Sequence, residues 1–154
     1  MKKTNILFIY GFNDGPESQV VSYLENILPK RYNVISDYYA QYNPIDALID
    51  LNNYINNYKI DVVIGENIGA YLSLFLDKNV KKILVNPIVN AKEELKKFDA
   101  SKGEDQKFIA DHIVDFYTDF ENTNPKIHQN NSYYIYSENS EDILEKIKEF
   151  LDIK

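Results

Sequence analysis

The sequence predicts an α/β fold, a three-layer sandwich in which a parallel sheet of about five strands lies between helices. Short apolar runs alternate with segments of helical periodicity along the whole chain, which is the pattern of consecutive βα units. Four of the five glycines also form two pairs, Gly11 with Gly15 and Gly65 with Gly69, and each pair directly follows an apolar run. In a chain this poor in glycine, such placement indicates tight strand-to-helix turns that the backbone requires.

The first half of the chain predicts three strands, each followed by a helix. Asn5–Tyr10 is an apolar run long enough for a buried strand, and the next helix is expected to begin near Pro16, because proline suits a first helical turn. The later segments are a strand over Tyr32–Asp37, a tyrosine-rich loop over 38–43, a helix from Pro44 to about Lys59, a strand over Ile60–Ile64 and a helix from about Ile68 to Asp77.

The second half predicts two further strands. They are expected over Lys82–Val85 and Ser132–Tyr136, and an amphipathic helix over Asp142–Ile153 closes the chain. Between them, residues 88–127 carry helical patterning over Glu93–Phe98 and Gln106–Phe116. We find no repeat and no linker, so residues 1–154 are predicted to form a single domain.

Composition and charge exclude several classes of function. The formal net charge is −7 with one arginine, which argues against nucleic-acid binding, and lysines 81, 82, 96 and 97 are expected to face solvent. There is no cysteine, no cluster with metal-ligand spacing and no phosphate-binding glycine loop, so we expect no metal and no cofactor. No apolar run suits a signal peptide or a membrane span, which predicts a cytoplasmic protein without a membrane partner.

The segment Asp61–Gly69 is the most informative motif. It reads as an apolar strand followed by Gly-Glu-Asn-Ile-Gly and a helix, which is the frame of a hydrolase nucleophile elbow with Asn67 in place of serine. A carboxamide has no ionisable proton and is a very poor nucleophile, so no neighbouring base can activate it. From the glycines alone, ordinary βα loops of any doubly wound protein remain an equally good interpretation.

Three stretches resemble a known family. Leu7–Asn13, Gly65–Gly69 and Leu84–Pro87 resemble, in order and spacing, the His-Gly-Phe-Asn-Ser, Gly-Ser-Ser-Leu-Gly and Val-Asn-Pro motifs of the YqiA-type small esterases of the α/β-hydrolase superfamily. The resemblance covers residues 5–90 well and the remainder weakly. It implies a minimal α/β-hydrolase core with strand order 2-1-3-4-5 and a small helical cap formed by the insertion 88–127.

The same resemblance implies that the catalytic triad is degenerate. Asn67 occupies the nucleophile position, and Tyr10 replaces the histidine before the first glycine. The family's Gly-x-x-Asp turn reads Ser137-Glu138-Asn139-Ser140 here, which leaves serine where the carboxylate is expected. Glu138, Glu141 or Asp142 could supply a carboxylate only through a re-routed loop. The triad histidine is expected after one further strand, which the sequence does not contain. Three such losses predict a noncatalytic protein.

The resemblance still implies a site that could bind a ligand. The backbone N–H groups of Phe12 and Ile68 occupy the family's oxyanion-hole positions. The alternative is that Asn67, Asn13 or water satisfies these amides. Glu66 is interpreted as a first-turn carboxylate that faces solvent. The predicted ligand-binding residues are Tyr10, Gly11, Phe12, Asn13, Glu66, Asn67 and Ile68.

Three functions remain open from the sequence. The favoured one is a noncatalytic protein that binds an unidentified small molecule or protein at the former active-site mouth, where tyrosines 10, 38, 39 and 42 are good interface anchors. The second is an active ester hydrolase with rearranged residues, in which His112 acts as the base; His128 is expected on the surface at the opposite end of the sheet. The third is a flavodoxin-like ligand-binding or signalling domain with the same strand order.

Overall fold

The computed structural model describes residues 2–12, 14–76, 79–88 and 104–152, with side chains for all of these except 104–111. The strands are β1 (Thr4–Ile9), β2 (Tyr32–Ile35), β3 (Val62–Glu66), β4 (Lys81–Val85) and β5 (Ser132–Ile135). The helices are α1 (Gln19–Ile27), α2 (Pro44–Asn57), α3 (Ile68–Ser73), α5 (Glu104–Asn122) and α6 (Ser140–Phe150). The predicted helical segment Glu93–Phe98 lies outside the described residues.

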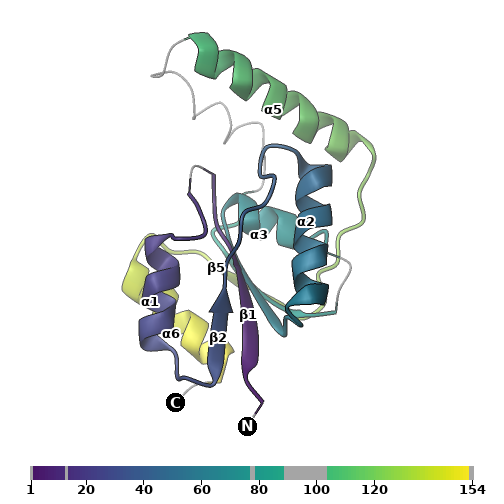
Figure 1. Cartoon of the computed structure of the whole chain (residues 1–154). Coiled ribbons are helices and arrows are strands. Elements are labelled where there is room, and N and C mark those ends of the chain that lie inside the picture. The colour runs from purple at the N-terminus through teal and green to yellow at the C-terminus, as the bar shows by residue number, and fades with distance from the viewer. Residues whose placement is uncertain (1, 13, 77–78, 89–103, 153–154) are drawn as a thin grey trace.

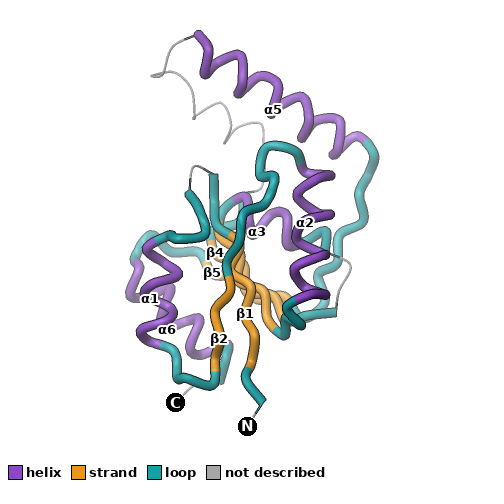
Figure 2. The backbone as a smooth tube through the Cα atoms, viewed as in Figure 1, coloured by secondary structure: helices purple, strands orange, loops and turns teal. Residues whose placement is uncertain are grey.

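The five strands form one parallel sheet in the order β2-β1-β3-β4-β5, which confirms the predicted topology. Helices α1 and α6 lie side by side on one face of the sheet, whereas α2 and α3 cover the other (Figure 1). Figure 2 shows the strands of this sheet between the two layers of helices. Helix α5 packs against α2 beyond that end of the sheet where β3 leads into α3.

The local helix signals decide where the helices begin. Ser18 caps α1, because its hydroxyl accepts a hydrogen bond from the Val21 N–H (3.4 Å). The prediction that this helix begins near Pro16 is therefore wrong by about one turn. Pro44 does open α2, and the Asn43 carboxamide oxygen accepts from the amides of Ile45 (3.1 Å) and Asp46 (3.3 Å).

Strand β3 is shifted relative to its prediction. It begins at Val62 and continues through Glu66, whereas the apolar run suggested Ile60–Ile64. The strand pairs on both sides, with β1 as far as Gly65 and with β4 as far as Glu66. Backbone pairing thus carries the strand past its apolar residues, and this shift determines where the Glu66 side chain points.

Three basic residues differ from their expected exposure, and Lys96 and Lys97 lie outside the described residues. Lys81 is half-buried, and its ammonium group donates a hydrogen bond to Phe150 O. Lys82 is 1% exposed, and its ammonium group donates hydrogen bonds to the carbonyl oxygens of Leu76 (3.3 Å) and His128 (2.9 Å). The expectation that Lys82 faces solvent is therefore wrong. His128 is half-buried, and its backbone N–H donates to Leu74 O (2.7 Å). None of the helices within the described ranges has the length and apolarity needed to cross a membrane.

Candidate ligand-binding site at the β3–α3 turn

The turn between β3 and α3 has the strained backbone of a nucleophile elbow. Asn67 adopts φ 53° and ψ −112°, and its side chain is exposed. Positive φ values are unfavourable for residues with a Cβ atom, and such strain costs of order 1–3 kcal/mol. The sharp turn places Asn67 beyond the last residue of β3, at the carboxyl-terminal end of the parallel strands.

The two glycines around Asn67 allow the chain to pack closely. A Cβ atom on Gly69 would lie 2.1 Å from the carbonyl oxygen of Ile9 in β1, and one on Gly65 would lie 2.6 Å from the carbonyl oxygen of Gly69. Both neighbours are backbone atoms that cannot move independently. The predicted backbone requirement is therefore confirmed for this pair. It is wrong for Gly15, around which no atom lies within 4 Å of such a Cβ.

The Asn67 main chain is held from three sides. Its N–H donates to Val85 O (3.0 Å), while its carbonyl oxygen accepts from Tyr71 N (3.0 Å) and Ile88 N (3.4 Å). Its side chain makes no capping hydrogen bond to α3, so the interpretation that Asn67 satisfies the helix-start amides is wrong. The carboxamide nitrogen instead lies 3.2 Å from the position that a Cβ on Gly11 would occupy. Gly11 and Asn67 are thus brought together, as the sequence predicted.

Tyr10 does not offer its hydroxyl at this site. The side chain is 1% exposed, and its hydroxyl accepts a hydrogen bond from Tyr39 N (3.3 Å). The Tyr39 hydroxyl in turn donates to Tyr10 O (2.6 Å), and the two ring centroids are 4.8 Å apart. Burial raises the pKa of both hydroxyls. Both residues, predicted to contact a ligand or partner, belong to the core; Ile68, with 0% exposure, does too.

Phe12 begins a chain of aromatic rings on the side of the turn that faces α5. Its ring stacks on Tyr42 (6.4 Å between centroids) and meets Tyr117 edge-on (6.2 Å). Tyr117 contacts Tyr71, which packs on Phe75, and Phe75 packs on Phe120. The Tyr117 hydroxyl donates to Gln41 O (2.7 Å), and the Tyr71 hydroxyl donates to Glu121 Oε1 (2.9 Å). Aromatic side chains therefore fill the space between α3 and α5.

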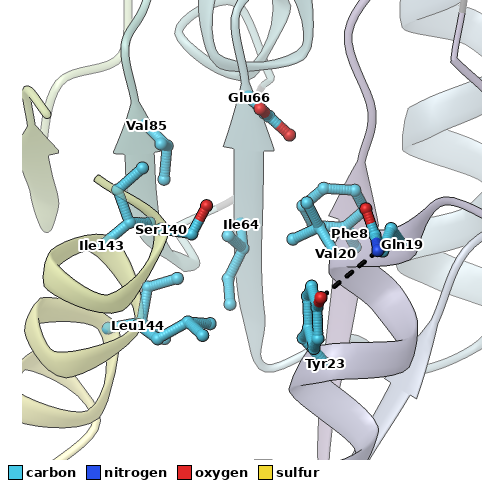
Figure 3. A pocket seen from close by; sticks show the side chains of 11 residues that line it. Phe8, Gln19, Val20, Tyr23, Ile64, Glu66, Val85, Ser140, Ile143 and Leu144 are labelled. Carbon is cyan, nitrogen blue, oxygen red and sulfur yellow. Dashed lines mark hydrogen bonds between the residues drawn. The ribbon is translucent and has the colours of Figure 1, made fainter. Parts of the chain in front are cut away.

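Glu66 points to the opposite face of the sheet. Side chains alternate along β3, so Glu66 shares a face with Ile64 and lies beside Val85 of β4. On this face a cavity of about 110 Å³ lies between α1 and α6, and Glu66 is at the end nearest the turn (Figure 3). The interpretation of Glu66 as a solvent-facing first-turn residue is wrong, because β3 extends through it.

The surroundings of Glu66 disfavour its ionised form. Burial raises the pKa of its carboxyl group, and the negative charge of Asp14 raises it further. Among the described residues, no hydrogen bond or ion pair involves this side chain. A half-buried carboxyl group without a cationic partner therefore borders the cavity beside Asn67.

A comparison with protein-family models shows to which family the chain belongs. The model of an uncharacterised protein family, UPF0227, matches residues 5–152 of the chain. The chain belongs to UPF0227. This is the family of the YqiA-like esterases, so the resemblance seen in the three sequence motifs is confirmed. A comparison with curated proteins found no match.

The fold of this UPF0227 protein is similar to that of a solved esterase (EaEST) from Exiguobacterium antarcticum. The TM-score is 0.55 with 13% sequence identity, and the alignment covers 98% of this chain and 90% of the esterase. The prediction of an α/β-hydrolase core is therefore confirmed. The flavodoxin-like alternative is not favoured by either comparison.

The turn 137–140 of this UPF0227 protein, which carries the predicted acid position at Ser140, has a structural role. Asn86, at φ 45°, accepts a hydrogen bond from Ser137 N (3.0 Å) and donates one to Ser137 O (2.7 Å), which ties the ends of β4 and β5 together. Asn139 caps α6 by accepting from Asp142 N (3.1 Å). Glu138 and Glu141 are exposed, and His112 is exposed on α5.

The site therefore unites three of the predicted ligand-binding residues, Gly11, Glu66 and Asn67, with Phe12 alongside; Asn13 lies outside the described residues. Sequence analysis missed the walls of the cavity, which come from α1 and α6. The amphipathic pattern of α6 indicated an apolar face, but no sequence signal indicates that this face leaves space against the sheet. The polar residues at the starts of both helices, Gln19 and Ser140, were the available hint.

Proposed function

We propose that this UPF0227 protein is a noncatalytic member of the esterase-like α/β-hydrolases that binds a small molecule or a protein partner at the former active-site mouth. The observation that carries the proposal is the strained elbow with a carboxamide at its tip. The fold still holds Asn67 at φ 53° and exposes its side chain, although a carboxamide cannot act as the nucleophile in acyl transfer.

The triad positions support the absence of hydrolysis. Asn67 occupies the nucleophile position, and Ser140, which carries no carboxylate, occupies the predicted acid position at the start of α6. Acyl transfer requires a nucleophile, a base that accepts its proton and a group that orients the base. Neither Asn67 nor Ser140 can supply its part, and Tyr10, which replaces the histidine before the first glycine, is buried against Tyr39.

The exposed groups at the mouth support binding. A carboxamide offers two N–H donors and a carbonyl acceptor, so Asn67 is suited to an amide, hydroxyl or carboxyl group of a ligand. Tyr38 is 72% exposed and Tyr42 is 41% exposed, and Tyr42 stacks on Phe12 near the turn. Exposed tyrosines of this kind contribute strongly to protein interfaces, so they support a protein partner as well as a small molecule.

An esterase assay tests the noncatalytic part of the proposal. Wild-type protein should hydrolyse a short-chain nitrophenyl ester no faster than the Asn67→Ala variant does. Turnover clearly above that control, and lost in Asn67→Ala or His112→Ala, would establish the alternative of an active hydrolase with rearranged residues.

Active-site labelling gives a sharper measurement. Asn67→Ser restores a hydroxyl at the elbow, yet labelling by a fluorophosphonate probe should stay slow because no base accepts the serine proton. Rapid labelling of one site per chain would mean that a base is present. The double variant Asn67→Ser with His112→Ala would then show whether His112 supplies it.

A further inference from the structure

The cavity between α1 and α6 has an apolar interior and one acidic end. Its floor is formed by side chains of three neighbouring strands and its walls by the facing sides of the two helices (Figure 3). The apolar lining residues are Phe8, Val20, Ile64, Val85, Ile143, Leu144 and Ile147. The polar lining consists of Gln19, Tyr23, Glu66 and Ser140, with Glu66 at the end that adjoins Asn67.

The size of the cavity limits the group that it accommodates. Its volume of about 110 Å³ is smaller than an engineered apolar cavity of about 150 Å³ that binds benzene. A branched aliphatic chain of about four or five carbons is therefore a suitable occupant. Apolar walls of this kind favour such a chain over water, because water finds few hydrogen-bond partners there.

The charge at the acidic end selects the head group. Glu66 has no ion-pair or hydrogen-bond partner among the described residues, and the negative charge of Asp14 adds to the effect of burial in raising its pKa. A partly desolvated carboxylate is costly unless it is paired with a cation. An anionic head group is repelled by both carboxylates, while an ammonium group is attracted. The hydroxyl of Ser140 and the carboxamide of Gln19, whose nitrogen already donates to the Tyr23 hydroxyl (3.2 Å), supply polar contacts beside it.

We propose that the ligand of this site is a short aliphatic primary amine, whose branched chain fills the α1/α6 cavity and whose ammonium group pairs with Glu66. The proposal rests on the proposed function in one respect, namely that the former mouth binds a ligand without converting it. It goes further by assigning the chemical class of the ligand and by placing its tail on the α1/α6 face instead of under α5.

A titration with 3-methylbutan-1-amine tests the proposal. An aliphatic amine is protonated at pH 7, since its pKa is close to that of lysine, about 10.4. In ¹⁵N-labelled protein at physiological salt, the amide signals of residues 19–23, 64–66 and 140–147 should shift and saturate, whereas those of residues 31–35 should not. The uncharged 3-methylbutan-1-ol, of nearly the same shape, should bind about tenfold more weakly because it lacks the charge-assisted contact.

Three variants distinguish the contribution of the Glu66 charge to amine binding from that of the cavity volume. Glu66→Gln should weaken amine binding about tenfold and abolish the preference for the amine over the alcohol. Glu145→Gln, which removes an exposed carboxylate from the same helix that forms the cavity wall, should leave the affinity unchanged. Leu144→Phe should reduce binding of both compounds by occupying the cavity with Glu66 intact. Thermal unfolding of each variant verifies that it is folded.

Equal affinity for amine and alcohol would overturn the assignment of an amine, and so would an amine affinity that Glu66→Gln leaves unchanged. Shifts confined to residues outside the cavity would also overturn it. The proposed function fails separately, through ester turnover or rapid probe labelling of Asn67→Ser. An absence of amine binding in an inactive protein would therefore refute only this inference.

Discussion

The two faces of the sheet differ in how completely they are packed. On the face covered by α2 and α3, rings from Phe12 to Phe120 contact one another in sequence, and Tyr117 is 0% exposed with its hydroxyl bonded. On the face covered by α1 and α6, the helices leave a cavity of about 110 Å³ and a half-buried carboxyl group without a partner. Both regions adjoin the same turn, because Glu66 directly precedes Asn67 and Phe12 follows Gly11, which packs against Asn67 (Figure 3).

This difference shows how a fold can retain the strained β3–α3 turn around Asn67 while the function of that turn changes. Among the described residues, interlocked rings pack on the α5 side of the turn, and a ligand that inserted between them would disrupt their packing. The other side offers unfilled volume and an unpaired charge at no such cost. The turn itself serves both faces, because Gly65 and Gly69 pack α3 against the sheet while Glu66 points away from α3.

The largest expected effect breaks the turn on which both faces depend. Gly69→Ala places a Cβ atom 2.1 Å from Ile9 O, so either α3 or β1 must move. We expect a loss of about 4 kcal/mol or more, or failure to fold. Gly15→Ala is the matched control, with no atom within 4 Å, and should change the free energy of unfolding by less than about 0.5 kcal/mol. Equal losses in urea denaturation would contradict the proposed role of close packing.

The next effect compares the two faces directly. Tyr117→Ala removes a fully buried ring and should cost about 3–5 kcal/mol in unfolding free energy. Leu144→Ala removes a half-buried side chain that already borders a cavity, and should cost about 1 kcal/mol. Urea denaturation of both variants at pH 7 measures the two values. Similar losses would mean that the faces are packed alike.

The sequence predicted the fold well because its signals are local. Apolar runs between helical segments identify the strands, and Pro44 identifies the start of α2. The glycine frame around Asn67 likewise predicted the strained turn. What the sequence did not indicate depends on pairing and packing over long range. The orientation of Glu66 follows from the extension of β3 between two neighbours, and the burial of Tyr10 follows from Tyr39, 29 residues away.

A smaller effect concerns the strain that exposes Asn67 between the faces. Glycine tolerates φ 53° and ψ −112° without a Cβ penalty, so Asn67→Gly should increase the free energy of unfolding by about 1 kcal/mol. Asn53→Gly, at an exposed position inside α2, should lower it by a few tenths of a kcal/mol through reduced helix propensity. Chemical denaturation at pH 7 measures both. Destabilisation by Asn67→Gly would show that the side chain contributes more than the strain costs.

The smallest effect is the pH dependence of stability that the Glu66 carboxyl group causes on the α1/α6 face. Burial and Asp14 raise the pKa of Glu66 in the folded protein above its unfolded value, so the folded state holds this proton more tightly. Ionisation then destabilises the fold: the penalty is absent below the unfolded pKa, grows as pH rises through the folded pKa and persists at neutral pH. Glu66→Gln cannot ionise, so its urea midpoint should exceed that of the wild type at pH 7 and match it near pH 4. Glu145→Gln, at an exposed site, should show no such divergence. A lower midpoint for Glu66→Gln at pH 7 would mean that the carboxylate has a stabilising partner, and the cavity would then lack the unpaired charge that distinguishes it from the packed face.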